Sequence, residues 1–377
     1  MELGVYVHIP FCAAKCKYCD FLSYPGQGKA KKDEYLHALR EETRLYLRNL
    51  PRFTVTNFYV GGGTPTCLSG GQLFLLLDFL GGLLQPAAGA EITIEANPAT
   101  LDREKLRALK KGGCTRLSLG VQSFHDGELH SLGRIHSRQD VYNTYKLARR
   151  MGFSNISLDL MYGLPGQEPA GWRESLREAV GLEPDHLSLY QLAIEPGTPF
   201  YDEFKQGLLQ EFEQDRAGEM YEEAIGFLAA QGFHHYEISN FARRGCESKH
   251  NQMYWQNREY LGLGAGAAGY LQGVRYTNQK NLAAYSEMVA QGVYPIGEKE
   301  KISTELAMRE FMFLGLRLLA GVDKNSFQER YGITLQERFG KVIQPLKAHG
   351  LLQEGENSLS LTRRGLYIAN EVFMAFL

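Results

Sequence analysis

Short apolar runs alternate with segments of helical periodicity along most of the chain. The runs predicted to form strands are 4–8, 56–60, 91–95, 116–121, 154–160 and 186–192. The amphipathic segments predicted to form helices between them include 32–50, 70–84, 102–111 and 140–151. Alternation of this kind is typical of βαβ units on a parallel sheet, and six such units predict an α/β fold with an open, partial (β/α)6 barrel.

The pattern changes after Phe241. Residues 242–300 are rich in glycine and carry few strand signals. Beyond them the sequence predicts helices over 304–319, 324–330, 335–349 and 363–376, with a short strand over 359–361, an order that resembles a small winged-helix module. We therefore expect a barrel over 1–241, a connecting region over 242–300 and a C-terminal winged-helix-like domain over 301–377.

Composition and charge limit the possible partners. Hydrophobic residues make up 44% of the 377 residues, enough to bury a large core, which excludes disorder as the main state. The net charge of −2, and mixed charges in the C-terminal module, argue against nucleic acid or anionic lipid as the main partner. The most apolar stretch, 73–84, is interrupted by Asp78 and is shorter than the ~20 residues of a membrane span. The first residues lack the features of a secretory signal, so we expect a cytoplasmic protein whose oligomeric state, a dimer included, stays open.

Three of the six cysteines lie close together after the first predicted strand. Cys12, Cys16 and Cys19 form the pattern C-x3-C-x2-C, with Tyr18 before the last cysteine. In a reducing compartment such a group indicates metal or redox chemistry. Three thiolates suit a [4Fe-4S] cluster with one iron open to a small chelating molecule, and the alternative is a zinc site with His8 as the fourth ligand. The scattered cysteines are expected to be buried small apolar residues: Cys67, Cys114 and Cys246.

Polar residues and glycines gather where predicted strands end. The segment GGGTP, residues 61–65, follows the second main strand, and its glycines let backbone approach a ligand closely; the alternative is a plain barrel turn. In barrels of this class the chemistry lies at the C-terminal ends of the strands. Glu95, Asn97, Gln122 and Asp159 lie at such ends, either as ligand-binding groups or as structural caps.

The cysteine pattern resembles the C-x3-C-x-aromatic-C signature of the radical S-adenosylmethionine (SAM) superfamily. The resemblance implies that Cys12, Cys16 and Cys19 hold a [4Fe-4S] cluster and that the amino and carboxylate groups of SAM chelate its open iron. An electron passed to the sulfonium would then release a deoxyadenosyl radical. By the same resemblance, Gly62, Gly63 and Thr64 belong to the segment that binds the methionine amino group.

Further motifs resemble the oxygen-independent coproporphyrinogen III oxidases and their relatives, over nearly the whole chain. They are YxHIPFC at 6–12, ExNP at 95–98, GVQSF at 120–124, GR at 133–134 and DLMYGLP at 159–165. The likeness implies a SAM site lined by Tyr6, Glu95, Gln122, Arg134, Asp159 and the backbone of Met161. The residue types are compatible with this site, because carboxylates accept from ribose hydroxyls and an arginine can pair with the methionine carboxylate.

Three features indicate which branch of this group of proteins the chain resembles. The oxidases carry a fourth cysteine where this chain has Phe21, and they carry a long segment before the cysteine motif, for which the sequence leaves no room. The HNxxYW motif at 250–255 is a marker of the HemW heme chaperone branch. The resemblance to that branch implies binding of heme and its transfer to acceptor proteins of unknown identity. The alternative is an enzyme, the oxidative decarboxylase of coproporphyrinogen III.

The HNxxYW motif contains the candidate heme ligand, His250. An imidazole is a good axial ligand for heme iron, and the aromatic rings of Tyr254 and Trp255 can pack on a porphyrin face. From the residues alone, a polar hinge between the barrel and the C-terminal domain is the alternative. Other histidines could serve equally well as the ligand: His130, His136, His234 and His235.

One further motif predicts no function. Residues 264–269 satisfy GxGxxG, the dinucleotide-binding fingerprint, which requires a strand before it and a helix after it. The neighbouring residues predict neither, so we expect these glycines to form a turn packed against the barrel.

Overall fold

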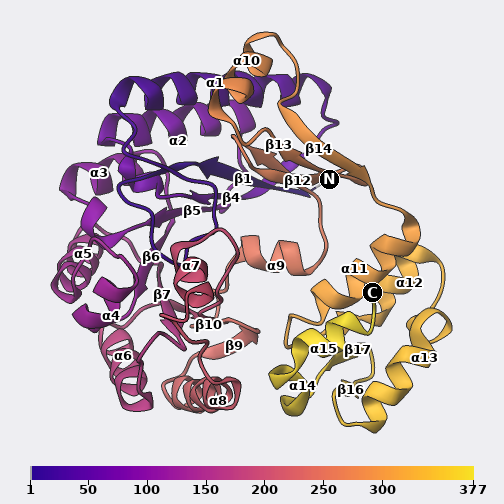
Figure 1. The fold of residues 1–377 in the computed structure, drawn as a ribbon. Helices are drawn as coiled ribbons and strands as arrows, with labels where there is room; N and C mark the ends of the chain where they lie inside the picture. The colour runs from indigo at the N-terminus through magenta and orange to yellow at the C-terminus, as the bar shows by residue number, and fades with distance from the viewer. Residues whose placement is uncertain (1) are drawn as a thin grey trace.

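Six parallel strands form the centre of a twelve-stranded sheet in the computed structural model, which describes residues 2–377. The strands follow one another across the sheet in chain order, and the sheet curves into an open barrel with helices on its outside (Figure 1). They are β1 (Glu2–Ile9), β4 (Thr54–Gly62), β5 (Glu91–Ala96), β6 (Arg116–Gln122), β7 (Ile156–Tyr162) and β8 (His186–Gln191). The predicted partial (β/α)6 barrel and all six of its strands are confirmed.

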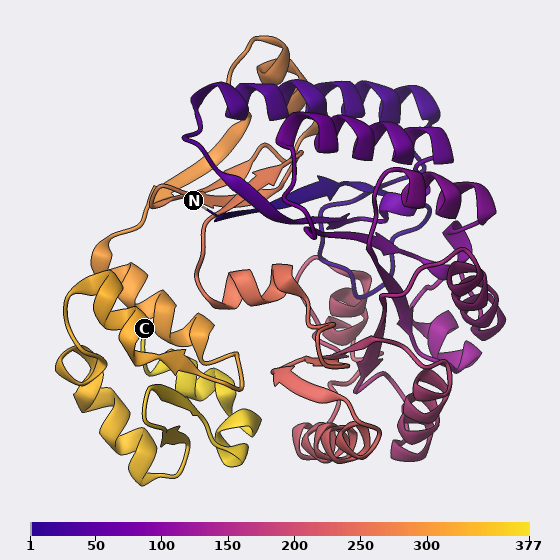
Figure 2. The same ribbon diagram turned by 180° about the vertical axis from the view of Figure 1, so that it is seen from behind.

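The outer layer consists of helices that connect the strands, as the two opposite views show (Figures 1 and 2). Asp102 and Ser137 mark two of the starts, because each side chain accepts a hydrogen bond from a backbone N–H in the first turn of the helix that follows. The four predicted helices are therefore present with small shifts at their ends. The outer helices are α1 (Lys29–Asn49), α2 (Gly70–Leu84), α3 (Arg103–Lys111), α4 (Asp126–Ser131), α5 (Arg138–Arg150), α6 (Pro169–Gly181) and α8 (Gln214–Ala230).

Alternation along each strand separates the core from the barrel interior. Val5 and Val7 on β1, and Leu158 on β7, are fully buried in the hydrophobic core beneath the helices. The positions between them carry polar groups, such as Tyr6 and Asp159, and these face the interior. Because side chains on a strand point to opposite faces in turn, the register that buries the valines also gathers the polar groups inside the barrel.

The sheet extends beyond the barrel at both edges. Antiparallel strands β10 (Asn240–Ala242) and β9 (His234–Glu237) follow β8, while β11 (Tyr260–Leu263) pairs in parallel with β1. Antiparallel strands β12 (Ala268–Leu271), β13 (Val274–Asn278) and β14 (Ile296–Lys301) complete that side. The expectation of few strands in 242–300 was therefore wrong. These strands are mostly short and rich in glycine or charge, so their alternation is too brief to detect in the sequence.

The GxGxxG segment forms the turn after β11 and the first two residues of β12, and the turn packs on α1. A strand does precede it, contrary to expectation, but no helix follows, so the dinucleotide fingerprint is not completed. Gly264 has φ +99°, and a Cβ there would lie 2.6 Å from the carbonyl oxygen of His8. The glycine therefore permits a close approach of two backbones, which is a structural role.

The C-terminal residues form a separate hydrophobic core, which includes Phe327 and Phe339. Its helices are α11 (Thr304–Gly315), α12 (Lys324–Tyr331), α13 (Leu335–Ala348), α14 (Arg363–Tyr367) and α15 (Ala369–Met374). Its three strands are β15 (Val322–Asp323), β16 (Leu352–Glu354) and β17 (Ser358–Leu361). The helix predicted over 363–376 is broken at Ile368, whose φ of −119° and ψ of 35° interrupt it. The domain boundaries predicted at 241 and 300 stay predictions.

A short helix, α9 (Lys249–Trp255), lies between the barrel and the C-terminal module (Figures 1 and 2).

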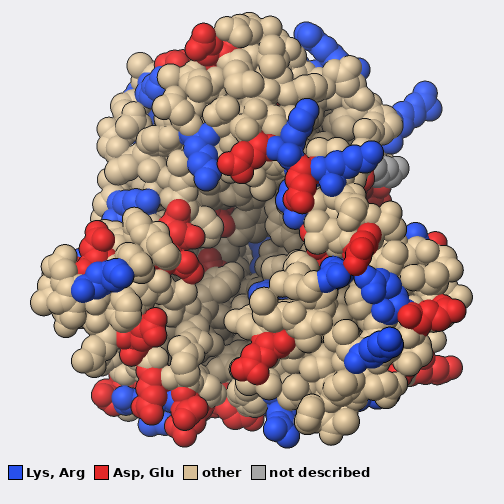
Figure 3. Space-filling view, turned by 45° about the vertical axis from the view of Figure 1, so that its right-hand side comes forward, with Lys and Arg blue, Asp and Glu red and all other residues tan. Residues whose placement is uncertain are grey.

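On the face seen in Figure 3 acidic and basic side chains are interspersed, and the surface is hollowed at its centre. Within residues 2–377, no helix combines the length and the apolar character needed to cross a membrane.

Glu42 on α1 joins the barrel to the extension of the sheet. It is fully buried, and its carboxylate accepts hydrogen bonds from the backbone N–H of Gly264 (2.7 Å), from Asn278 Nδ2 (2.6 Å) and from Tyr285 Oη (2.7 Å). Burial raises the pKa of Glu42 to about 7. The three donors come from segments more than two hundred positions away in the sequence, so this single side chain ties α1 to the region after β11.

We expect Glu42→Ala to lower the free energy of unfolding by about 3 kcal/mol, because it leaves buried donors without an acceptor. Denaturant unfolding followed by circular dichroism measures this. Glu41→Ala is the matched control, since Glu41 pairs with Arg44 at the partly exposed surface of the same helix and should change stability by less than about 0.5 kcal/mol. Equal effects of the two substitutions would contradict the role of Glu42.

Candidate functional site

The cysteine-containing loop covers the C-terminal end of the barrel. It leaves β1 through β2 (Phe11–Cys12) and returns through β3 (Tyr24–Pro25), which pairs with β2. Backbone hydrogen bonds fix its middle: Lys17 N donates to Leu132 O, and Phe200 N, at the start of α7 (Pro199–Lys205), donates to Lys17 O, both at 3.0 Å. The loop is therefore held by segments that follow β6 and β8.

The three thiols line one cavity of about 380 Å³ under this loop. Arg134 Nη1 donates to Cys16 Sγ at 3.4 Å, and Cys12 Sγ lies 3.6 Å from Thr64 Oγ1. Burial raises the pKa of Cys12, and it raises the pKa of Cys19 to about 11. The predicted cluster ligands are thus brought together, partly buried and next to a cationic side chain.

The chemistry of the donor set, three thiols in one cavity, fits an iron–sulfur cluster. Within residues 2–377 no three Cys, His, Asp or Glu side chains converge as the ligands of one metal ion do. Cysteine thiolates are the ligands of [4Fe-4S] clusters, and three of them would leave one iron without a protein ligand. The other cysteines do not line this cavity: Cys114 is buried as expected, whereas Cys67, which shares a neighbouring cavity with Cys12, and Cys246 are partly exposed, contrary to expectation.

His8 is engaged away from the thiols. Its Nε2 donates to the carbonyl oxygen of Leu22 at 2.9 Å, so its Nδ1 is the acceptor for the hydroxyl of Tyr6, also at 2.9 Å. With both ring nitrogens occupied, His8 does not serve as a fourth zinc ligand in this arrangement. It instead ties the end of the cysteine loop to the barrel wall.

The GGGTP segment packs directly on the cysteine loop. Gly63 N donates to Ile9 O at 3.0 Å, and Thr64 N donates to Phe11 O at 2.7 Å. A Cβ on Gly63 would lie 2.7 Å from Phe11 O, so only glycine permits this contact. The two loops therefore form one unit, and Gly62, Gly63 and Thr64 line the cavity beside the thiols.

Two carboxyl groups, those of Glu95 and Asp159, form the floor of the cavity. Glu95 accepts hydrogen bonds from Tyr59 Oη at 2.8 Å and from Gly62 N at 3.2 Å. Burial raises the pKa of Glu95 to about 7, and the nearby carboxylate of Asp159 adds to this effect. Asp159 accepts from Ser118 Oγ at 3.0 Å, and burial raises its pKa as well.

Unpaired polar atoms indicate that the cavity is built for a ligand. Arg134 Nη2 donates to Gly120 O at 2.5 Å, but Arg134 Nε has no partner, and neither has the buried Oε1 of Gln122. Gln122 also has φ +68°, beside a register shift between β6 and β7. Strained backbone and unsatisfied polar groups are typical of binding sites.

Most of the predicted SAM-binding residues line this cavity, but Tyr6 does not. The lining includes Gly62, Gly63, Thr64, Glu95, Gln122, Arg134, Asp159 and Met161. Tyr6 lies in the barrel wall, where its hydroxyl binds His8. Sequence reasoning missed Tyr59, Ser118 and Tyr190, which also line the cavity. All three are inward-facing positions of barrel strands, so strand alternation was the signal that could have found them.

Comparison with known proteins agrees with this geometry. Residues 6–179 match the radical SAM superfamily, and residues 302–368 match the HemN C-terminal domain. The chain is 43% identical to the heme chaperone HemW of Bacillus subtilis, over 99% of both chains. The chain belongs to the HemW family. HemW of Escherichia coli is 33% identical over 100% of this chain and 98% of its own length.

A related enzyme shares the fold. The structure of the coproporphyrinogen III oxidase HemN from Escherichia coli superimposes with a TM-score of 0.87 at 27% identity, covering 100% of this chain and 90% of HemN. The radical SAM barrel and the C-terminal module are therefore common to HemN and this member of the HemW family.

The HNxxYW motif of this HemW family member forms α9, and its histidine is buried. His250 is 1% exposed, Nδ1 lies 2.6 Å from Asn57 Oδ1, and Nε2 lies 2.9 Å from Tyr254 Oη. The guanidinium of Arg317 lies 4.4 Å from the ring of Trp255. Ligation of heme iron by His250 stays a prediction, and it requires that one of these hydrogen bonds break.

The other candidate histidines differ in their exposure to solvent. His136 is buried, with Nε2 at 3.0 Å from Val121 O, and His235 stacks on Phe241. His130 and His234 are exposed.

We expect Cys12→Ala, Cys16→Ala and Cys19→Ala each to abolish cluster incorporation, because each thiolate is a proposed iron ligand. Iron analysis and visible absorption after anaerobic reconstitution measure this, with about four irons per wild-type chain. Cys246→Ala is the control and should retain the cluster. A full iron content in any of the three variants would contradict its assignment.

Proposed function

We propose that this chain binds heme and passes it to acceptor proteins of unknown identity, with a [4Fe-4S] cluster on Cys12, Cys16 and Cys19. The observation that carries the proposal is the 43% identity, over 99% of both chains, to a heme chaperone HemW. The three thiols in one cavity at the end of a radical SAM barrel support it. The free state of these cysteines is compatible with a reducing, cytoplasmic location.

SAM is the small molecule proposed for the cavity. Arg134 would pair with the methionine carboxylate, and the segment of Gly62, Gly63 and Thr64 would bind the amino group. Glu95 and Asp159 would accept from the ribose hydroxyls, and the free Oε1 of Gln122 supplies a further acceptor. A SAM-chelated cluster supplies one-electron chemistry at the sulfonium when it is bound.

Phe21 separates the chaperone from the oxidase alternative. It occupies the position at which the oxidases, by the resemblance, carry a fourth cysteine, and a phenyl ring cannot ligate iron. Phe21 is 62% exposed and Tyr190 is 43% exposed, and both line the cavity. Exposed aromatic rings offer an apolar face on which a porphyrin can pack, so this rim is the proposed seat of heme.

We expect cluster-loaded protein, given SAM, a reductant and coproporphyrinogen III without oxygen, to leave the mass of the tetrapyrrole unchanged. The same preparation should bind heme, seen as a shift of the Soret absorption that saturates with added protein. Mass spectrometry and absorption spectroscopy read the two results. Loss of two carboxyl groups from coproporphyrinogen III would make the chain an oxidase and overturn the proposal.

A further inference from the structure

The helix of the HNxxYW motif places His250 between two cavities of the barrel. On β4, Tyr59 lines the cavity of the cysteines, while Asn57, two residues earlier, lines a hollow at the opposite end of the barrel. His250 contacts both: its ring stacks on Tyr59, with 5.0 Å between centroids and 21° between planes, and its Nδ1 lies 2.6 Å from Asn57 Oδ1. The imidazole therefore lies directly beneath the proposed SAM site.

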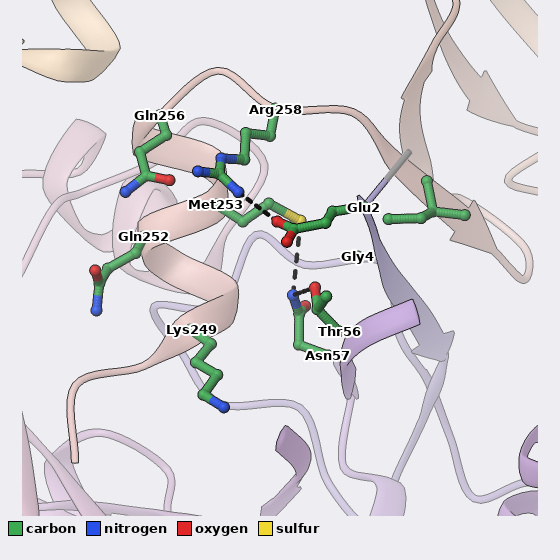
Figure 4. Close-up of a pocket in the computed structure, with 10 residues that line it drawn as sticks. Glu2, Gly4, Thr56, Asn57, Lys249, Gln252, Met253, Gln256 and Arg258 are labelled. Atoms are coloured by element: carbon green, nitrogen blue, oxygen red, sulfur yellow. Dashed lines mark hydrogen bonds and ion pairs between the residues drawn. The ribbon is translucent and has the colours of Figure 1, made fainter. Parts of the chain in front are cut away.

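The orientation of His250 is fixed by its neighbours. Asn57 Nδ2 donates to Thr56 Oγ1 at 3.2 Å and faces Met253 Sδ at 3.9 Å, as Figure 4 shows, so the amide oxygen of Asn57 is turned to the histidine. His250 Nδ1 must then be the donor, and Nε2 accepts from the Tyr254 hydroxyl at 2.9 Å. Burial lowers the pKa of His250 to about 3, which keeps the ring neutral.

Tyr59 connects this histidine to the cavity. Its hydroxyl donates to Glu95 Oε1 at 2.8 Å, and the other oxygen of Glu95 accepts from Gly62 N at 3.2 Å. The ring of Tyr59 thus packs on His250, and its hydroxyl orients the carboxylate of Glu95 in the cavity. Tyr6 stacks on the same ring at 6.4 Å and completes the packing.

We propose that His250 is a positioning residue for the SAM site: its ring holds Tyr59 in the orientation in which the hydroxyl binds Glu95. This inference rests on the proposed function, because it takes SAM as the ligand of the cavity. It gives the HNxxYW motif a role in the barrel interior, in addition to the heme ligation predicted for His250. Tyr254, from the same motif, holds the second ring nitrogen of His250.

The test measures the affinity of cluster-loaded protein for SAM by equilibrium dialysis, with iron content as the check on folding. Tyr59→Phe removes the hydroxyl from Glu95 and should weaken SAM binding about tenfold, the effect of one hydrogen bond to a charged group. His250→Ala removes the stack and should weaken it several-fold. If His250 acts through Tyr59, the double variant is no weaker than Tyr59→Phe alone. Gln252→Ala, on the same helix but lining the hollow at the opposite end of the barrel from the cysteines, is the control and should bind as wild type (Figure 4).

The outcomes separate this inference from the proposed function. Wild-type protein that carries its cluster but does not bind SAM would refute the cofactor assignment itself. Wild-type binding with an unaffected His250→Ala variant, or with effects that multiply in the double variant, would overturn only the positioning role. If His250→Ala does not retain its cluster, His250→Phe and His250→Gln decide: the ring of phenylalanine should preserve SAM binding and glutamine should not, and the reverse order would overturn the proposal.

Discussion

The site depends on the contact between the backbones of two loops, the cysteine loop and the glycine-rich loop. Gly63 and Thr64 donate to the carbonyl oxygens of Ile9 and Phe11, at a separation that leaves no room for a Cβ on Gly63. This contact sets Thr64 beside Cys12 and leaves Gly62 N free to donate to Glu95. A side chain on Gly63 would push the loops apart, and with them the thiols from the carboxylates that share their cavity.

The barrel strands beneath the two loops are held in register by the alternation of their side chains. The residues that point outward from β1 and β4 are apolar and buried under helices, so the register of these strands is fixed. The inward positions carry aromatic and polar side chains, and these pack on one another instead of facing solvent. In this arrangement α9 closes the open side of the barrel, and the stack of Tyr59 on His250 joins a segment far along the chain to the cavity.

The barrel strands and the cluster ligands could be predicted from the sequence, and each feature that was missed has a physical reason. The six parallel strands carry long apolar runs, so they were predicted, and the cysteine spacing predicted the ligands that the cavity brings together. Strands β11 to β14 were missed because most are short and rich in glycine or charged residues. The burial of His250 was missed because its partners, Asn57 and Tyr59, lie nearly two hundred positions earlier. Tyr6 was assigned to the cavity by resemblance, whereas its hydroxyl is taken by His8.

The central claim is that heme is carried and handed on unchanged by a protein that also holds a cluster and SAM in the cavity at the end of its barrel. The most direct measurement loads the cluster-containing, SAM-bound protein with heme and mixes it with an excess of an apo-haemoprotein. The two proteins are then separated and their Soret absorption and tetrapyrrole masses are compared. The account predicts that heme of unchanged mass appears in the acceptor. Heme that stays on the donor, or a tetrapyrrole of altered mass, would contradict it.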